Sequence, residues 1–340
     1  MDYKRDKDAV VLLAHGDGGL LSRELMEKVF LRYFKSPLLE QLDDAAVLTM
    51  PSYRLAVTTD AYVVDPIFFP GGDIGKLAIY GTVNDLAVSG AHPRYITVAF
   101  ILEEGLPLAN LEMVCASMAE ACKEAGVTMV AGDTKVVPRG AADKLFITTT
   151  GVGAVPADIS PGYHRVRPGD KIIINGSLGN HGLTILSARE KLGLGGALKS
   201  DCAPLQGIAG RIWDRCPGVK IMRDLTRGGL ATAAKEIAQS CAMDMYIKEK
   251  LIPIDPEVQG GTEMLGLDPL YLANEGKFIT IIKDGEAASA LDIMHSHPLG
   301  EKAVIIGEVE AGKGNVYLET PLGGTKILGM LAGNPLPRIC

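Results

Sequence analysis

The sequence predicts a mixed α/β protein with two domains. Its 340 residues are enough for two domains of ordinary size, since one domain usually takes about 100–200 residues. Hydrophobic residues make up 47% of the chain and charged residues 22%, as is typical of globular proteins. Apolar positions recur in some segments every three or four residues and in others every two. Helices and strands therefore alternate along the chain, which favours α/β architecture.

Three prolines mark the expected domain boundary, because proline breaks both helices and strands. Pro156, Pro161 and Pro168 fall within thirteen residues of one another. We therefore divide the chain into an N-terminal domain, a C-terminal domain and a tail that carries Cys340. Their limits are residues 1–157, 165–330 and 331–340.

In the first half, apolar spacing defines the expected elements. Leu21, Leu25 and Val29 lie on one helix face, and this helix ends near the proline at position 37. Helical spacing returns from residue 73 to 90, whereas residues 95–102 are rich in β-branched and aromatic side chains. The further expected elements are strands at 45–50, 55–59, 128–131 and 145–152, and a helix at 111–125.

The second half repeats this pattern. We expect strands at 171–174, 219–222, 277–282 and 303–308, a helix after His181 and another at 230–240. After Met330 the chain reads LAGNPLPRIC, in which two prolines exclude a regular helix. This segment is expected to form an extended tail.

Charge and composition exclude several classes of function. The formal net charge is −7 and no long basic run occurs, so a surface for binding phosphate backbones is not expected and nucleic acid is not a predicted partner. No stretch of about 18 uncharged apolar residues predicts a membrane helix. The six cysteines form no CxxC pair. These features predict a soluble protein of the reducing cytoplasm.

Acidic residues cluster at the ends of apolar strands in the first half. Burying carboxylates beside small apolar residues is costly unless a cation or a hydrogen-bond network compensates them. Magnesium that bridges a polyphosphate is such a cation, since it takes oxygen ligands from carboxylates and phosphates. Each aspartate taken alone favours a turn or a helix cap, and it is the set of five that favours a site. The set consists of Asp43, Asp44, Asp60, Asp85 and Asp133.

A glycine-rich segment, FFPGGDIGKLAIYGTVND, lies among these acids. Gly71 and Gly72 are suited to presenting backbone N–H groups to a phosphate, and Asp73 to capping the following helix. The spacing does not fit a Walker A loop, because Pro70 and Leu77 stand where that motif needs Gly and Ser or Thr. A Walker-type nucleotidase is therefore disfavoured.

Three motifs of the second half remain open to two interpretations. NGSLGNHG, residues 175–182, is either an anion-binding turn or a simple connection from strand to helix. RDLTRGG and ANEGK contain Arg227 and Glu275, which are either reactive groups or caps.

Taken together, these motifs resemble a known family. DDAAV, a strand ending in TTD, GGDIGKLAIYGTVNDLAVSGA and GDTKVV resemble in order the ATP-using enzymes related to aminoimidazole ribonucleotide synthetase, thiamine monophosphate kinase and selenophosphate synthetase. FFPGGDIGKLA, NGSLGNHG, RDLTRGG, ANEGK and the terminal PRIC resemble more narrowly the HypE family of hydrogenase maturation factors. The resemblance spans His15 to Cys340. One departure is Asn180, where that family commonly has an acidic residue.

The resemblance implies a fold and an activity. The fold would be the two-domain aminoimidazole ribonucleotide synthetase-like architecture with a flexible C-terminal tail, and the first domain would form a homodimer through its sheet. The activity would be an ATP-dependent dehydration that turns an S-carboxamide on Cys340 into a thiocyanate, the source of the cyanide ligand of nickel-iron hydrogenases. The implied partners are the carbamoyltransferase HypF and an iron-carrying HypC-HypD complex.

The resemblance also implies roles for single residues. ATP and Mg²⁺ would be the cofactors, with the five aspartates as metal ligands. Cys340 would carry the substrate, Lys135 would either supply a positive charge or hold the carboxamide, and Glu275 would be the base. Contacts to ATP are expected from Gly71, Gly72, Asp73, Asn84, Thr134 and Arg227.

Two other functions would use part of the same motifs. A small-molecule kinase or synthetase of the same superfamily would share the aspartates, and a scaffold that binds nucleotide without turnover would share the glycine-rich segment. Such a kinase has no use for a terminal Pro-Arg-Ile-Cys, so the tail distinguishes it from the dehydratase. Phosphate release measured with an unmodified and a carbamoylated tail would distinguish the scaffold.

Overall fold

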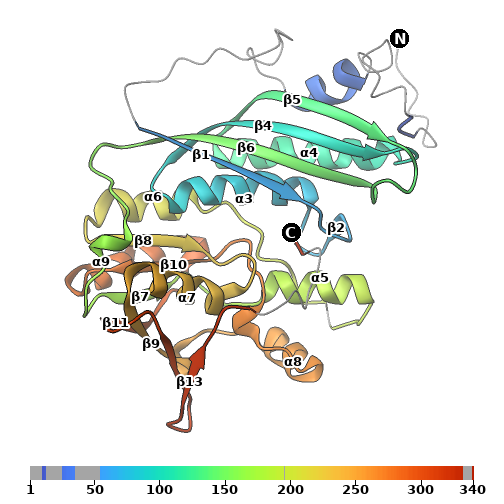
Figure 1. The fold of residues 1–340 in the computed structure, drawn as a ribbon. Coiled ribbons are helices and arrows are strands. Elements are labelled where there is room, and N and C mark those ends of the chain that lie inside the picture. The colour runs from blue at the N-terminus through green and yellow to red at the C-terminus, as the bar shows by residue number, and fades with distance from the viewer. Residues whose placement is uncertain (1–9, 13–24, 35–53, 195, 332–338) are drawn as a thin grey trace.

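The computed structural model describes residues 10–12, 25–34, 54–194, 196–331 and 339–340. Two sheets, each with its own helices, lie one above the other, and the C-terminus lies between them (Figure 1). In the part of the chain that is described, no helix has the length and apolar character needed to cross a membrane.

The upper sheet has four strands in the order β1-β6-β4-β5. Strands β4 and β5 are parallel and are joined through helix α4, whereas the other neighbouring pairs are antiparallel. Helices α3 and α4 cover one face of this sheet (Figure 1), where alternate residues of β4 such as Ile96, Val98 and Phe100 are buried. The bounds are β1 (Arg54–Tyr62), α3 (Ile74–Val88), β4 (His92–Glu103), α4 (Leu108–Ala125), β5 (Thr128–Val137) and β6 (Leu145–Val155).

The opposite face of this sheet is not covered by any described helix (Figure 1). Leu55, Val57 and Ile101 stand on it with 54%, 63% and 40% of their surface exposed. We call this surface the outer face. Its exposed branched side chains are of the kind that proteins normally cover.

The lower sheet has seven strands in the order β13-β12-β9-β11-β7-β10-β8. Helix α7 packs on the side of Ile172 and Ile174, and helices α6 and α9 pack on the side of Ile173. Its central strands are buried on both faces, so they are continuous apolar runs. The bounds are β7 (Lys171–Ile174), α5 (Asn180–Glu190), α6 (Gln206–Arg215), β8 (Val219–Asp224), α7 (Gly229–Cys241), β9 (Met243–Lys248), α8 (Pro256–Leu265), β10 (Phe278–Ile282), α9 (Asp284–His295), β11 (Val304–Ala311), β12 (Val316–Glu319) and β13 (Thr325–Leu328).

Short elements complete the described chain. A two-stranded sheet of β2 (Phe68–Phe69) and β3 (Gly72–Asp73) precedes α3. Near the N-terminus a π-helical turn, Met26–Phe30, continues into α2 (Leu31–Tyr33). Four 3₁₀ turns lie at Tyr163–Arg165, Glu249–Leu251, Pro269–Tyr271 and Pro298–Gly300.

Helix α3 belongs to both halves of the molecule. Its last turn contributes Leu86, Ala87 and Val88 to a core that also contains Trp213 of α6. Asn84 adds polar contacts: its amide nitrogen donates to Ala203 O (3.1 Å) and Glu275 O (3.2 Å), and its oxygen accepts from Leu205 N (2.7 Å). The helix therefore fixes the second half of the chain against the first.

Most predicted elements are confirmed with extended ends, and the helix expected at 21–34 is helical in its described part from Leu25 to Tyr33. The strand expected at 45–50 lies outside the described residues, as do residues 332–338 of the expected tail. The sequence prediction omitted α6, α8, α9, β9, β12 and β13. Strands β9, β12 and β13 are only 6, 4 and 4 residues long, so they show little alternation, whereas Ile208, Ala209, Ile212 and Trp213 give α6 the spacing of one helix face, and this helix was detectable from the sequence.

Gly71 offers a test of how the two halves meet. It has φ +92°, and a Cβ there would lie 2.7 Å from Ser200 O, in a segment whose Ser200 N donates to Pro70 O. We expect Gly71→Ala to lower the free energy of unfolding by about 1–3 kcal/mol more than Gly169→Ala, measured by urea denaturation. Gly169 is the matched control, since it has φ +91° with nothing within 4 Å of its Cβ position. Equal losses in both variants would contradict the close approach.

Candidate active site

Four carboxyl groups from separate elements meet between the two sheets. Asp60 lies on β1, Asp85 on α3, Asp224 at the end of β8 and Glu275 in the loop before β10. Each of the other three raises the pKa of Glu275, which shows that the four are electrostatically close. We call these four residues the acidic cluster.

Few hydrogen-bond donors contact the carboxyl oxygens of the acidic cluster. Thr58 Oγ1 donates to Asp85 Oδ2 at 2.8 Å, and Thr82 Oγ1 donates to Asp60 Oδ2 at 3.4 Å. Glu275 is only 3% exposed, and its Oε1 has no hydrogen-bond partner among the described residues. An unpaired buried oxygen of this kind is costly, so the cluster is built to receive a further group.

Burial and mutual repulsion both favour the protonated carboxyls. Burial, then Asp224 and Asp60, raise the pKa of Asp85 to about 7. Burial raises the pKa of Asp224 to about 6, although Arg223 opposes the shift. Burial, followed by the charges of the neighbouring acids, holds the pKa of Glu275 well above its ordinary value. Glu275 is therefore a stronger base than an exposed glutamate once it has lost its proton.

The C-terminus of the chain reaches this cluster. Ile339 is 4% exposed and belongs to the core of the first half, while Val63 N donates to the terminal Cys340 O at 3.3 Å. Burial, then the charge of Glu275, raise the pKa of the Cys340 thiol to about 12, and Arg227 opposes the shift. The described end of the tail thus places a neutral thiol within the electrostatic range of Glu275 in the same chain.

The glycine-rich segment is engaged within the protein. Asp73 Oδ1 accepts from Gly75 N (2.7 Å) and Lys76 N (3.2 Å), which confirms its expected role as the cap of α3. It also accepts from Ser117 Oγ. Gly71 and Gly72 pack against residues 199–202 of the second half. Their predicted ATP contacts are not tested by these interactions.

The other expected ATP contacts come from separate elements of the chain. The amide N–H groups and the amide oxygen of Asn84 both form hydrogen bonds between the two halves of the chain. Arg227 is exposed in the loop between β8 and α7. Thr134 lies on β5, where its N–H donates to Asp133 Oδ1.

Strand register separates part of the predicted metal set. Asp133 is paired through Ala99 and Thr148 with Ala61, and residues opposite one another in a sheet share a face. Asp60, the neighbour of Ala61, therefore points to the helix-covered face, whereas Asp133 stands on the outer face. Lys135 stands there too, 3.9 Å from Asp133 between Nζ and Oδ2. Within one chain, neither residue joins Asp60 and Asp85.

The donor set of the acidic cluster suits a hard cation, because it offers carboxylate oxygens and one unpaired buried oxygen. Among the described residues, no three such groups are already close enough to hold a metal ion. Asp43 and Asp44, the other predicted ligands, lie outside the described residues.

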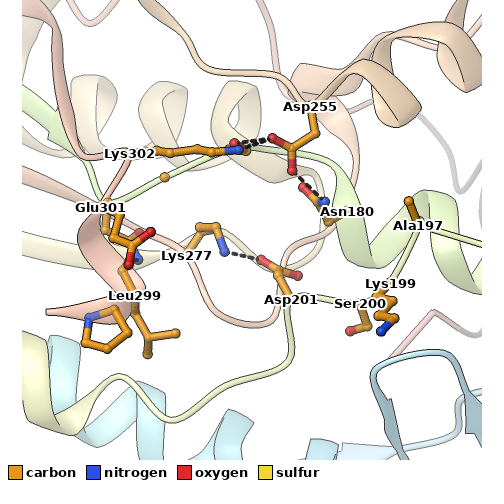
Figure 2. A pocket seen from close by; sticks show the side chains of 14 residues that line it. Asn180, Ala197, Lys199, Ser200, Asp201, Asp255, Lys277, Leu299, Glu301 and Lys302 are labelled. Carbon is orange, nitrogen blue, oxygen red and sulfur yellow. Dashed lines mark hydrogen bonds and ion pairs between the residues drawn. The ribbon is translucent and has the colours of Figure 1, made fainter.

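Asn180, where the sequence departs from the resembled family, lines a cavity of about 310 Å³ in the second half of the chain. Figure 2 shows its amide beside Asp255, to which Nδ2 donates at 3.0 Å; Lys302 Nζ lies 2.6 Å from the same carboxylate. An acidic residue at position 180 would face Asp255 with like charge. The amide nitrogen therefore fits its surroundings as a hydrogen-bond donor, whereas Asn180 Oδ1 is buried without a hydrogen-bond partner among the described residues.

Two site residues were not singled out by the sequence analysis. Asp224 carried the same signal as the chosen aspartates, an acid at the end of an apolar strand. His181, which contacts the tail, is a lone histidine within NGSLGNHG, and no pattern in the sequence connects it with residue 339.

The fold and the interdomain site define the class of protein to which the chain belongs. The AIR synthase related protein N-terminal domain model matches residues 42–155, and the corresponding C-terminal domain model matches residues 167–319. These matches confirm the predicted two-domain mixed α/β architecture.

More specific relatives cover nearly the whole chain. Carbamoyl dehydratase HypE of Rhodobacter capsulatus is 50% identical over 98% of this chain and 99% of its own. A crystal structure of hydrogenase maturation protein HypE in complex with ATP is 49% identical, with TM-score 0.94 over 97% of this chain and 99% of that one. A HypE-HypF complex is 42% identical, with TM-score 0.80 over 90% and 99%. The chain belongs to the HypE family.

The raised pKa of Asp85 predicts a pH-dependent effect on stability. A carboxyl whose pKa is higher in the folded state opposes folding more as pH rises from about 4 to 7. We expect Asp85→Asn to raise the free energy of unfolding by roughly 1–3 kcal/mol at pH 8, and by little at pH 4, in denaturant titrations. Asp133→Asn is the exposed control and should change stability little at either pH. Equal destabilisation by Asp85→Asn at both pH values would contradict the repulsion.

Proposed function

We propose that the protein is an ATP-dependent carbamoyl dehydratase that converts an S-carboxamide on Cys340 into a thiocyanate. The observation that carries this proposal is the position of Cys340, the last residue of the chain, beside the buried Glu275. Relatives named carbamoyl dehydratase HypE, and the HypE structure that contains ATP, support the reaction and its nucleotide. The thiocyanate would serve as the cyanide source for nickel-iron hydrogenase maturation.

The reaction divides into an activation and an elimination. The carboxamide oxygen attacks the γ-phosphoryl group of ATP, which releases ADP, and the oxygen then leaves carbon as phosphate. The two N–H protons depart as the carbon–nitrogen triple bond forms. Glu275 would take a proton, because a buried carboxylate with a raised pKa is strongly basic and its charge acts on the thiol that bears the carboxamide.

Magnesium is part of the proposal. Asp60 and Asp85 would hold it from the acidic cluster, with Asp43 and Asp44 as further ligands. It would neutralise charge on the phosphates of ATP. Asp133 stays in the proposal as a metal ligand and Lys135 as a source of positive charge, and because both stand on the outer face, they would act at the site of a second copy of the chain. The proposed ATP contacts are Gly71, Gly72, Asp73, Asn84, Thr134 and Arg227.

The remaining proposals concern assembly. The HypE-HypF complex supports the carbamoyltransferase HypF as the partner that loads Cys340. An iron-carrying HypC-HypD complex would receive the product in the cytoplasm. The domain limits at residues 157 and 165, with the tail from residue 331, also remain our proposal.

We further propose that the outer face forms a homodimer. Exposed apolar residues on a sheet face are normally covered, and here they stand in the same sheet as Lys135 and Asp133. A dimer through this face would bring those two charged groups to the subunit interface.

Val57→Lys tests the dimer. A lysine at this position would place a charge on the proposed interface, so sedimentation velocity should show a shift from dimer to monomer. Ile327→Lys is the matched control, because Ile327 is equally exposed at 63% but lies on β13 of the other sheet. A wild-type protein that sediments as a monomer over the whole concentration range would contradict the proposal.

Mass spectrometry of the terminal peptide tests the function. After incubation with the transferase, carbamoyl phosphate and ATP, we expect a carboxamide on Cys340 and then its dehydrated form. Cys340→Ser should accumulate no thiocyanate, whereas Cys241→Ser, which alters a partly buried cysteine of α7, should react normally. Carboxamide or thiocyanate on any other cysteine would contradict the assignment.

A further inference from the structure

His181 joins the C-terminal dipeptide to the second half of the chain. Its ring is buried in the first turn of α5, and its Nε2 lies 2.8 Å from Ile339 O. Phe69 of β2 meets the ring edge to face, with 5.6 Å between ring centroids. Figure 1 shows the C-terminus in this region, between α5 and β2.

The hydrogen-bond partners determine which ring nitrogen carries the proton. A carbonyl oxygen only accepts, so Nε2 must be the donor to Ile339 O. Nδ1 lies 2.8 Å from Ser200 Oγ, and Ser200 Oγ in turn accepts from Cys202 N at 3.1 Å. Burial lowers the pKa of His181 and favours the neutral ring, so the Ser200 hydroxyl donates to Nδ1. Ser200 thereby fixes the tautomer that binds the tail.

Three contacts locate the last two residues. His181 donates to the Ile339 carbonyl, Val63 N donates to a terminal carboxylate oxygen of Cys340, and the Ile339 side chain is buried in the core. Of the two hydrogen bonds, the one from His181 is the shorter, at 2.8 Å against 3.3 Å. The Ile339 carbonyl lies one residue before Cys340. Loss of its hydrogen bond from His181 would therefore loosen the position of Cys340 Sγ, the atom that carries the substrate.

We propose that His181, oriented by Ser200, is a positioning residue that docks the C-terminal dipeptide and so holds the Cys340 carboxamide against Glu275. This inference rests on the proposed dehydration for its catalytic consequence. It assigns a role to NGSLGNHG other than anion binding, because the histidine of that motif receives the tail.

Docking has opposite consequences for the two steps of the reaction. Loading by an external transferase needs an accessible Cys340 thiolate, whereas the docked thiol is half-buried and its pKa is raised. Dehydration needs the docked position. Weaker docking should therefore leave loading as fast or make it faster while it slows dehydration, and a general loss of structure would slow both.

The first experiment measures docking without ATP or transferase. Alkylation of Cys340 by N-ethylmaleimide is followed by mass spectrometry of the terminal peptide in wild type, His181→Leu, His181→Gln and Ser200→Ala. We expect alkylation about tenfold faster in His181→Leu, as for the loss of one hydrogen bond to a buried carbonyl, and an intermediate rate in Ser200→Ala. His181→Gln, whose amide keeps a donor, should restore most of the protection.

His295→Leu is the control, because His295 Nε2 also bonds a backbone carbonyl, Ala303 O at 2.9 Å, but lies at the end of α9. In this variant, Cys340 should be alkylated at the wild-type rate. If His181→Leu does not fold, Ser200→Ala decides the matter. Wild-type alkylation in a folded His181→Leu or Ser200→Ala would overturn the proposal.

The second experiment measures both reaction steps in the same variants. Single-turnover dehydration of the loaded chain should fall about tenfold in His181→Leu, with the KM for ATP and the loading rate not reduced. If a variant is alkylated faster at Cys340 but dehydrates the carboxamide at the wild-type rate, docking does not affect catalysis and that part of the proposal is wrong. If wild-type protein shows no dehydration, the proposed function fails, while the alkylation result still decides docking.

Discussion

The placing of four carboxyl groups together in a largely enclosed position is the constraint on which the site depends. Burial and the charges of neighbouring acids, Asp60 among them, raise the pKa values of Asp85, Asp224 and Glu275, and one oxygen of Glu275 has no hydrogen-bond partner among the described residues. Such an arrangement lowers stability unless a ligand or proton compensates it. The same electrostatics make Glu275 basic and would attract a cation that accompanies ATP. This use explains why the protein keeps an arrangement of acids that lowers its stability.

Helix α3 keeps these groups together. It carries Asp85, and one residue earlier Asn84 bonds the segment at Ala203 and Leu205 and the backbone of Glu275. The acids of the first half and those of the second are thereby fixed at one place. The C-terminal dipeptide enters the same space, so the chain supplies both the catalytic groups and the residue that we propose as the carrier of the substrate.

Much of this could be predicted from the sequence. Periodicity located α3, β4 and α7, the strand-end rule found Asp60, and Asp85 was found as an acid beside small apolar residues of a predicted helix. The rule also selected Asp133, which the sheet register places on the other face, because apolar alternation alone does not assign a side chain to a face that a helix covers. His181 and Ile339 are 158 residues apart, and only the folded chain brings them within hydrogen-bond distance.

The central claim is that Glu275 acts as the base for the carboxamide on Cys340. The most direct test is to follow nitrile formation on the carbamoylated Glu275→Gln variant. Glutamine keeps the shape of the side chain but cannot accept the proton. Infrared spectroscopy of a single turnover should show the nitrile band in wild type, while the variant binds ATP and stops at the carboxamide. A nitrile band that appears at the wild-type rate in Glu275→Gln would contradict the account.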